Sequence, residues 1–139
     1  MSSNLYASSE EVKLLLEENW CLSSQPDISF MWEEKSTGFM DDRREFILIT
    51  PTNEDPEYFG LYGSDFLHHI FVKIDIHSFQ NLEHHENLVN EVFRIMKGSI
   101  RSLNSTYVDL LIVNSIHDND LYRNIYRHSI IVKFRKLNP

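Results

Sequence analysis

The sequence predicts an α+β protein: a mostly antiparallel sheet, with an N-terminal helix and one long central amphipathic helix packed on one of its faces. Strict apolar–polar alternation marks a strand over Phe71–His77, and apolar residues at steps of three and four mark a long helix over Asn81–Leu103. Two further strand-like segments follow that helix, so strands come in runs rather than in βαβ alternation. With 139 residues, 42% of them hydrophobic, the chain suits a single domain over residues 1–139.

The first predicted element is a helix over Ser9–Trp20. Ser8 followed by Glu11 matches a capping box, which is a common helix start. Apolar residues then recur at helical spacing, and they should lie on the sheet: Val12, Leu15, Leu16 and Trp20. Residues 1–8 are expected to form a flexible N-terminal segment.

Three short strands are predicted before the middle of the chain. The first is Ile28–Lys35, and a turn over Ser36–Arg44 leads to the second, Glu45–Thr50. Pro51–Pro56 is acidic and rich in turn residues, so we expect an exposed loop there. Tyr58–Tyr62 then reads as a brief edge strand.

The strongest strand signal begins near Phe66, and the most convincing helix follows it. Ile70, Val72, Ile74 and Ile76 share one strand face, which predicts a buried face and a partly wet one. The central helix is expected over Asn81–Leu103, although Gly98 is a poor helix former that favours an end near Lys97.

A long hairpin is predicted at the C-terminus. Tyr107–Ile116 is apolar on both faces at its centre, which is typical of a strand in mid-sheet. His117–Asp120 supplies turn residues, and Leu121–Leu137 returns as an alternating strand. One face of that strand carries Tyr126, His128, Ile130, Val132 and Phe134, and the other carries Arg127, Ser129, Ile131, Lys133 and Arg135.

Charge is segregated along the chain. Residues 1–93 hold 18 acidic and 5 basic residues, whereas residues 94–139 hold 3 acidic and 8 basic residues, within a net charge of −8. The acidic total disfavours general binding of nucleic acid, which is a polyanion. Scattered solvated charge would explain the pattern, and so would a dipolar subunit whose basic side meets DNA or a neighbour's acidic side.

No catalytic motif or cofactor motif stands out, so the sequence predicts neither an enzyme nor a bound cofactor. None of the four glycines forms a phosphate-binding loop. Cys21 is the single cysteine, and it follows a helix C-terminus, where the dipole disfavours a thiolate; we expect it to pack behind Trp20. The sequence also contains no cationic leader and no apolar run of membrane-spanning length.

Two weaker patterns in the sequence are candidates for a metal-binding site. Seven histidines include the adjacent pairs His68–His69 and His84–His85, but neighbours in a strand point to opposite faces, and the H-E-x-x-H spacing is missing. Asp27, Glu33 and Lys35 superficially resemble the carboxylate set of metal-dependent nucleases, but they would lie along one strand. Surface or half-buried histidines and solvated charges at a strand end explain these residues, and no metal site is predicted.

The basic C-terminal residues are the best candidates for a functional surface. From Leu121 to Lys136 the chain holds five cationic residues and no acid: Arg123, Arg127, Lys133, Arg135 and Lys136. Strand geometry puts Arg127, Lys133 and Arg135 on one side. Arginine and lysine neutralise phosphate and nearby aromatic rings stack on bases, so this surface suits either nucleic acid or another subunit.

The layout and several segments resemble the tail-terminator and tail-completion proteins, the head–tail joining family of tailed viruses. The segments are FVKIDIH (residues 71–77), EVFRIM (91–96), YVDLLIVNSIHDND (107–120) and IYRHSIIVKFRK (125–136). The resemblance covers roughly residues 66–137, and no catalytic residues come with it.

The resemblance implies a virion protein of the tail or neck, present in the host cytoplasm during assembly. It implies a homo-oligomeric ring, commonly a hexamer, that caps the tail tube, joins it to the connector and lies close to passing DNA. The exposed strand edges, the loop Thr50–Pro56 and the five basic residues would then be the contact surfaces. The alternatives are a small nucleic-acid-binding accessory protein that uses the basic C-terminal strand and a small metal-dependent enzyme.

Overall fold

The computed structural model describes residues 4–31, 45–59, 65–79, 81–99, 107–119 and 125–137. Two helices and five strands make up this part of the chain: α1 (Asn4–Asn19), β1 (Asp27–Phe30), β2 (Phe46–Phe59), β3 (Asp65–Ser78), α2 (Leu82–Gly98), β4 (Tyr107–His117) and β5 (Tyr126–Leu137). Neither of these helices is long and apolar enough to cross a membrane.

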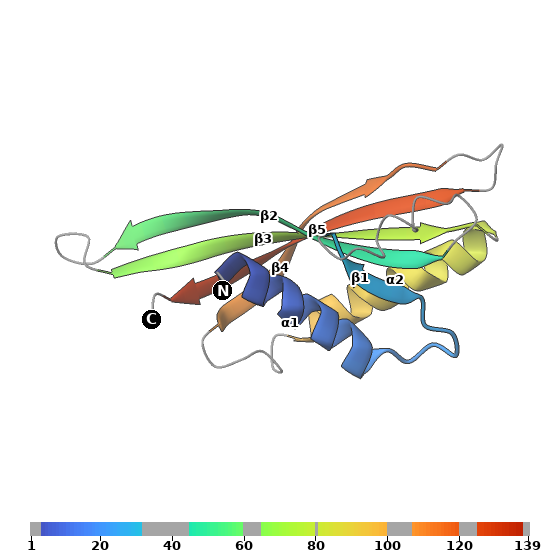
Figure 1. Ribbon diagram of the computed structural model, residues 1–139, viewed down its shortest axis with the longest axis horizontal. Helices are drawn as coiled ribbons and strands as arrows, with labels where there is room; N and C mark the ends of the chain where they lie inside the picture. Colours follow the sequence, from blue (N-terminus) through green and yellow to red (C-terminus); the bar gives the residue numbers. More distant parts are fainter. Residues whose placement is uncertain are drawn as a thin grey trace.

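The five strands form one sheet in the order β1-β2-β3-β5-β4. β1 pairs with β2 in parallel, and every other pairing is antiparallel. Both helices lie on the same face of the sheet, α1 towards β1 and β2 and α2 towards β4 (Figure 1). The predicted α+β class, with helices on one face of a mostly antiparallel sheet, is confirmed.

The core lies between the helices and the sheet. Alternate residues of β3 point into it, and Ile70, Val72, Ile74 and Ile76 are all fully buried, as the alternation predicted. The matching face of β5 contributes Ile130, Val132 and Phe134, also fully buried. Helix α1 supplies Val12, Leu15 and Leu16, and helix α2 supplies Leu88, Val89, Val92, Ile95 and Met96.

Helix α2 begins one residue after the predicted start at Asn81. It ends near Lys97, the earlier of the two predicted ends, and not at Leu103. Asn81 caps its first turn, because its side-chain oxygen accepts a hydrogen bond from the His84 backbone N–H at 2.8 Å. The helix ends at Gly98, so the earlier end is confirmed for the described residues.

Helix α1 starts earlier than predicted. Residues 4–8, expected within a flexible segment, form its first turns. Ser8 is not a cap but a buried helical residue, whose hydroxyl lies 3.0 Å from the Tyr107 hydroxyl of β4. The Ser9 hydroxyl donates to the carbonyl of Leu5, four residues earlier in the helix.

The prediction of a loop over Pro51–Pro56 is wrong, because strand β2 continues through these residues to Phe59. A bulge between Pro51 and Asn53 accommodates the extra residue Thr52, whose hydroxyl donates to the Phe71 carbonyl at 2.8 Å. β1 pairs only with Phe46–Ile49, so the rest of β2 has an open outer edge among the described residues. Proline is tolerated there, because no partner needs its missing N–H.

Other predicted boundaries also shift. Strand β1 ends at Phe30, and the rest of the predicted strand and turn over residues 32–44 lies outside the described residues. Tyr58 and Phe59 belong to β2 rather than to a separate edge strand, and residues 60–62 are outside the described part. The predicted hairpin is confirmed, with β5 beginning at Tyr126 and pairing antiparallel with β4.

Candidate assembly surface

Strand β5 divides the predicted basic residues between two faces of the sheet. Arg127, Lys133 and Arg135 alternate with the buried residues of β5, and so lie on the face that neither described helix covers; we call it the open face. Lys136 lies on the helix side, with its ammonium 5.6 Å from the centre of the Tyr107 ring. Arg123 lies outside the described residues.

Arg135 is already paired within the chain. Its guanidinium donates two hydrogen bonds from Nε to the carboxylate of Asp109 on β4, at 2.8 and 2.9 Å, and a third from Nη2. These bonds hold the pKa of Asp109 below its usual range, because they favour the charged carboxylate. The pair ties β4 to β5, and it removes one of the predicted residues from the set of freely available cations.

Asp75 adds a carboxylate to the open face, beside the basic strand β5. This carboxylate on β3 is 5% exposed, accepts a hydrogen bond from the Ser129 hydroxyl at 2.5 Å and lies 3.6 Å from the Lys73 ammonium. The centre of the open face therefore interleaves cations with carboxylates. Such a surface favours a partner with its own mixed charges over a continuous phosphate backbone.

Arg127 occupies a more enclosed position on the open face. It pairs across the strands with His77, whose ring stacks on Phe46 with centroids 4.4 Å apart. Burial first, and then the charge of Arg127, lower the pKa of His77 to about 4. His77 is therefore neutral at neutral pH and adds no positive charge beside Arg127.

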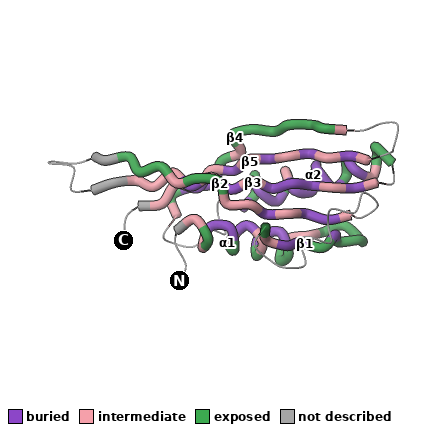
Figure 2. The backbone as a smooth tube through the Cα atoms, turned by 45° about the horizontal axis from the view of Figure 1, so that its top comes forward, coloured by how far each residue is buried: buried purple, intermediate pink, exposed green. Residues whose placement is uncertain are grey.

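Strand β4 is the feature that sequence reasoning placed wrongly. It was expected in mid-sheet because its centre is apolar on both faces, but it is an edge strand that pairs only with β5 among the described residues. Figure 2 shows it exposed along most of its length. Four of its apolar side chains are exposed: Val108 (48%), Leu111 (42%), Val113 (45%) and Ile116 (53%).

A pocket of about 330 Å³ lies between α2 and the hairpin of β4 and β5. It is lined by Glu86, Val89, Asn90, Phe93, Ser115, His117 and His128. The Nδ1 atoms of His117 and His128 are 3.0 Å apart, and Nε2 of His128 is hydrogen-bonded to the Ser115 hydroxyl. Burial, and then His117, lower the pKa of His128 to about 4, so the His128 ring is neutral at neutral pH.

Three further histidines pair with carboxylates. His68 contacts Glu54, His69 contacts Glu57 and His84 contacts Glu45, at 2.5, 2.7 and 3.0 Å. Within the described ranges, no three His, Cys, Asp and Glu side chains come together so that they could hold a metal ion. Of the nuclease-like set, Asp27 is an exposed residue of β1, and Glu33 and Lys35 lie outside those ranges.

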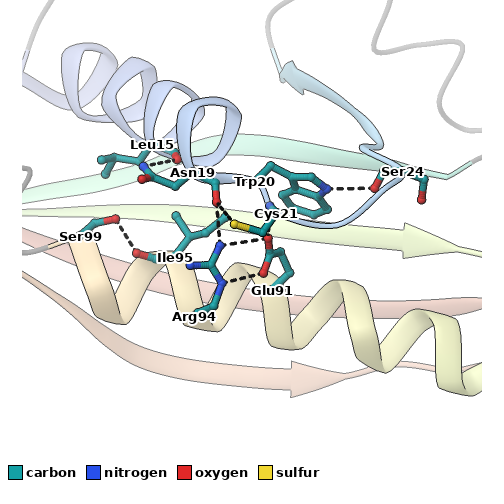
Figure 3. A network of polar contacts seen from close by, with 9 residues as sticks. All are labelled: Leu15, Asn19, Trp20, Cys21, Ser24, Glu91, Arg94, Ile95 and Ser99. Atoms are coloured by element: carbon teal, nitrogen blue, oxygen red, sulfur yellow. Dashed lines mark hydrogen bonds and ion pairs between the residues drawn. The ribbon is translucent and has the colours of Figure 1, made fainter.

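The end of α1 is fastened to α2 by a compact set of hydrogen bonds (Figure 3). Glu91 on α2, which is 6% exposed, accepts the backbone N–H of Cys21 at 2.5 Å and two hydrogen bonds from Arg94. Arg94 also donates to the carbonyl of Asn19, the last residue of α1, at 2.6 Å. The prediction that Cys21 packs behind Trp20 is wrong, because its thiol is exposed.

The fold therefore defines a class: an α+β chain in which two helices cover one face of a five-stranded sheet and leave an apolar strand at its edge. No known family profile and no curated protein matches the sequence. Among solved structures, the chain is similar to a chain of the virion of a native gene transfer agent particle. The TM-score is 0.68 at 10% sequence identity, over 99% of this chain and 100% of that one. At this identity the likeness shows a shared fold.

Proposed function

We propose that this chain is a structural protein of a virion, located at the head–tail junction. In this role, copies of the chain form a ring that caps the tail tube and joins it to the connector. The role is assembly rather than catalysis, and it needs no cofactor. Six copies is the stoichiometry that the resemblance to tail-terminator proteins implies.

The observation that carries the proposal is the end-to-end likeness to a virion component. The similarity spans 99% of one chain and 100% of the other, so it involves the complete arrangement of helices and strands and not one common motif. The segments that resemble tail-terminator proteins lie in β3, α2, β4 and β5, which follow one another along the chain. The likeness to the virion chain supports a virion role, and the resemblance to tail-terminator proteins adds the head–tail position to the proposal.

The surface of the subunit supports the same role. A ring subunit needs contact surfaces on two opposite sides, because each copy touches two neighbours. The described structure has an exposed apolar strand, β4, at one sheet edge, and exposed apolar residues of α1, such as Leu14, beside the other edge. Proteins rarely leave long apolar edge strands uncovered when they act alone.

Gene deletion and complementation in the cell that encodes the chain test the proposal. We expect particles produced without the protein to carry tails of irregular length, or heads and tails that do not join, in negatively stained electron micrographs. A plasmid copy should restore joined particles and should add the chain to purified virions. Normal particles in its absence, or purified virions that lack the chain, would refute the proposal.

A further inference from the structure

The apolar side chains left at the surface are concentrated at two opposite edges of the molecule. Among the large apolar residues that are exposed in the described structure, four belong to β4: Val108, Leu111, Val113 and Ile116. Four others lie on or beside α1 and β1: Tyr6, Leu14, Leu22 and Met31. In Figure 2, β4 lies at one edge of the sheet, and α1 and β1 lie together at the other.

The β4 edge has few of the devices that normally prevent strand edges from associating. Short length, lysine, proline, β-bulges and inward charge are the usual protections. β1, at the opposite edge, has four residues and follows Pro26. β4 has eleven residues and contains no lysine, arginine or proline. Its protections are two register shifts, between Tyr107 and Asp109 and between Ile112 and Asn114, and the buried Asp109, which is paired with Arg135.

The apolar surface of β4 continues onto the open face. Register places Leu111 and Ile116 on that face, opposite Lys133 and Ser129 of β5, with Ile131 between them. Val113 lies where the register shifts between Ile112 and Asn114, at a bulge. A partner at this edge would therefore meet apolar side chains as well as unpaired backbone groups.

The charges beside the two edges are complementary. The described segments on the α1, β1 and β2 side, residues 4–31 and 45–59, contain nine acidic residues and one basic residue, Lys13. The described segments of the β4 and β5 side, residues 107–119 and 125–137, contain two acidic and four basic residues. All four of these basic residues belong to β5, the strand next to β4, and Arg135 is paired with Asp109, so Arg127, Lys133 and Lys136 supply the positive charge that matches the acidic edge of a second copy.

We propose that the β4 edge binds the α1–β1 edge of a second copy, with Leu111 and Ile116 meeting the apolar residues around Leu14. The contact is heterologous, because two different surfaces meet, and repeating it produces a ring when the rotation closes. This inference rests on the proposed function, for which it supplies the subunit interface. A contact between two β4 edges, related by a two-fold axis, is the competing arrangement.

Three variants test the interface: Leu111→Lys with Ile116→Lys, Leu14→Lys, and the control Leu82→Lys. Leu82 is 42% exposed, like Leu111, but it is the first residue of α2, soon after the central strand β3, and belongs to neither edge. Sedimentation velocity over a concentration series measures self-association, and circular dichroism checks that each variant is folded. We expect each edge variant to weaken association by roughly tenfold or more, as loss of a central apolar anchor does, and the control to match the wild type.

Mixing distinguishes the two arrangements. In the heterologous arrangement, the β4 variant and Leu14→Lys each keep one intact edge, so their mixture should form dimers that do not grow into rings. Normal self-association of Leu14→Lys alone, with loss only in the β4 variant, would indicate that two β4 edges meet. A wild-type chain that stays monomeric at about 1 mM would overturn the interface.

The same variants separate this inference from the proposed function. If edge variants associate normally while gene deletion still gives unjoined particles, the interface is wrong and the virion role stands. If the edges associate as described but the chain is missing from purified virions, the virion role is wrong and the interface stands.

Discussion

Replacing Glu91 with Gln should loosen the attachment of helix α1 to helix α2. Glu91 is 6% exposed, and its carboxylate accepts the Cys21 backbone N–H at 2.5 Å and the Arg94 Nε and Nη2 donors at 2.7 and 3.0 Å. Gln has nearly the same size and keeps one acceptor oxygen. The substitution therefore removes the charge and turns one acceptor into a donor that faces other donors.

The expected loss of stability follows from these contacts. A hydrogen bond to a charged group contributes about 1.5–3 kcal/mol. Glu91→Gln disturbs at least two such bonds, but the Arg94 side chain is 51% exposed, and solvent weakens its share. We therefore expect the free energy of unfolding to fall by about 2–3 kcal/mol, which for a chain of this length lowers the melting temperature by about 6–9 °C.

Urea unfolding followed by circular dichroism at pH 7.5 measures this loss. Glu86→Gln is the matched control, since Glu86 is an exposed residue of the same helix and its replacement should cost less than about 0.5 kcal/mol. A loss below about 1 kcal/mol, or one equal to the control's, would refute the account of the helix attachment.

The pH dependence provides a second check. Hydrogen bonds from Arg94 lower the pKa of Glu91 from 4.5, so its charged form stabilises the folded state above that pH. The stability difference between wild type and Glu91→Gln should be full at neutral pH and should shrink as the pH falls below 4.5. A difference that stays constant down to pH 3 would show that the charge is not the cause.

Three other predictions concern the core and the hairpin. Burial lowers the pKa values of His85 and His128 from 6.5 to about 4, so the unfolded chain binds more protons than the folded chain between these pH values. The free energy of unfolding should therefore fall as the pH drops below 6.5, by up to about 3 kcal/mol for each residue. An unchanged urea midpoint between about pH 7.5 and 5 would contradict this prediction. Phe134→Ala should cost about 3–5 kcal/mol, because this fully buried ring leaves a cavity, and a loss under about 1 kcal/mol in the same assay would argue against the core described here. Asp109→Asn should cost about 1 kcal/mol by weakening the partly exposed pair with Arg135, and less at 1 M salt; an effect that does not depend on salt would indicate a packing role instead.

Periodicity predicted the elements that face the core. The alternation in β3 and β5 and the helical spacing in α2 are local signals, and each reports directly which side of an element is buried. Ile74 of β3 and Ile130 of β5 are fully buried as predicted, because one helix-covered face decides the register of both strands.

The position of a strand within the sheet could not be predicted in the same way. β4 is apolar on both faces, which is typical of a central strand and equally typical of an edge that another chain covers. Pro51 and Pro56 suggested a loop, but prolines are tolerated where one edge of β2 has no partner. In both cases the missing information was the neighbour of the strand, which no local pattern encodes.

The sequence predicted which basic residues form the candidate surface, but it did not predict that one of them is paired with a carboxylate. Charge segregation along the chain is visible in the sequence, and three of the five basic residues lie on the open face. The bond between Arg135 and Asp109 joins residues 26 positions apart, and it depends on the hairpin register with its bulges. Sequence spacing alone does not specify that register, so the neutralisation of Arg135 could not be predicted.

A cryo-electron microscopy reconstruction of the neck of purified particles tests the central claim most directly. The account predicts a closed ring of this α+β subunit between the tail tube and the connector. Within that ring, β4 of each copy should lie against α1 and β1 of the next. A neck without this subunit, or the subunit found in another part of the particle, would contradict the account.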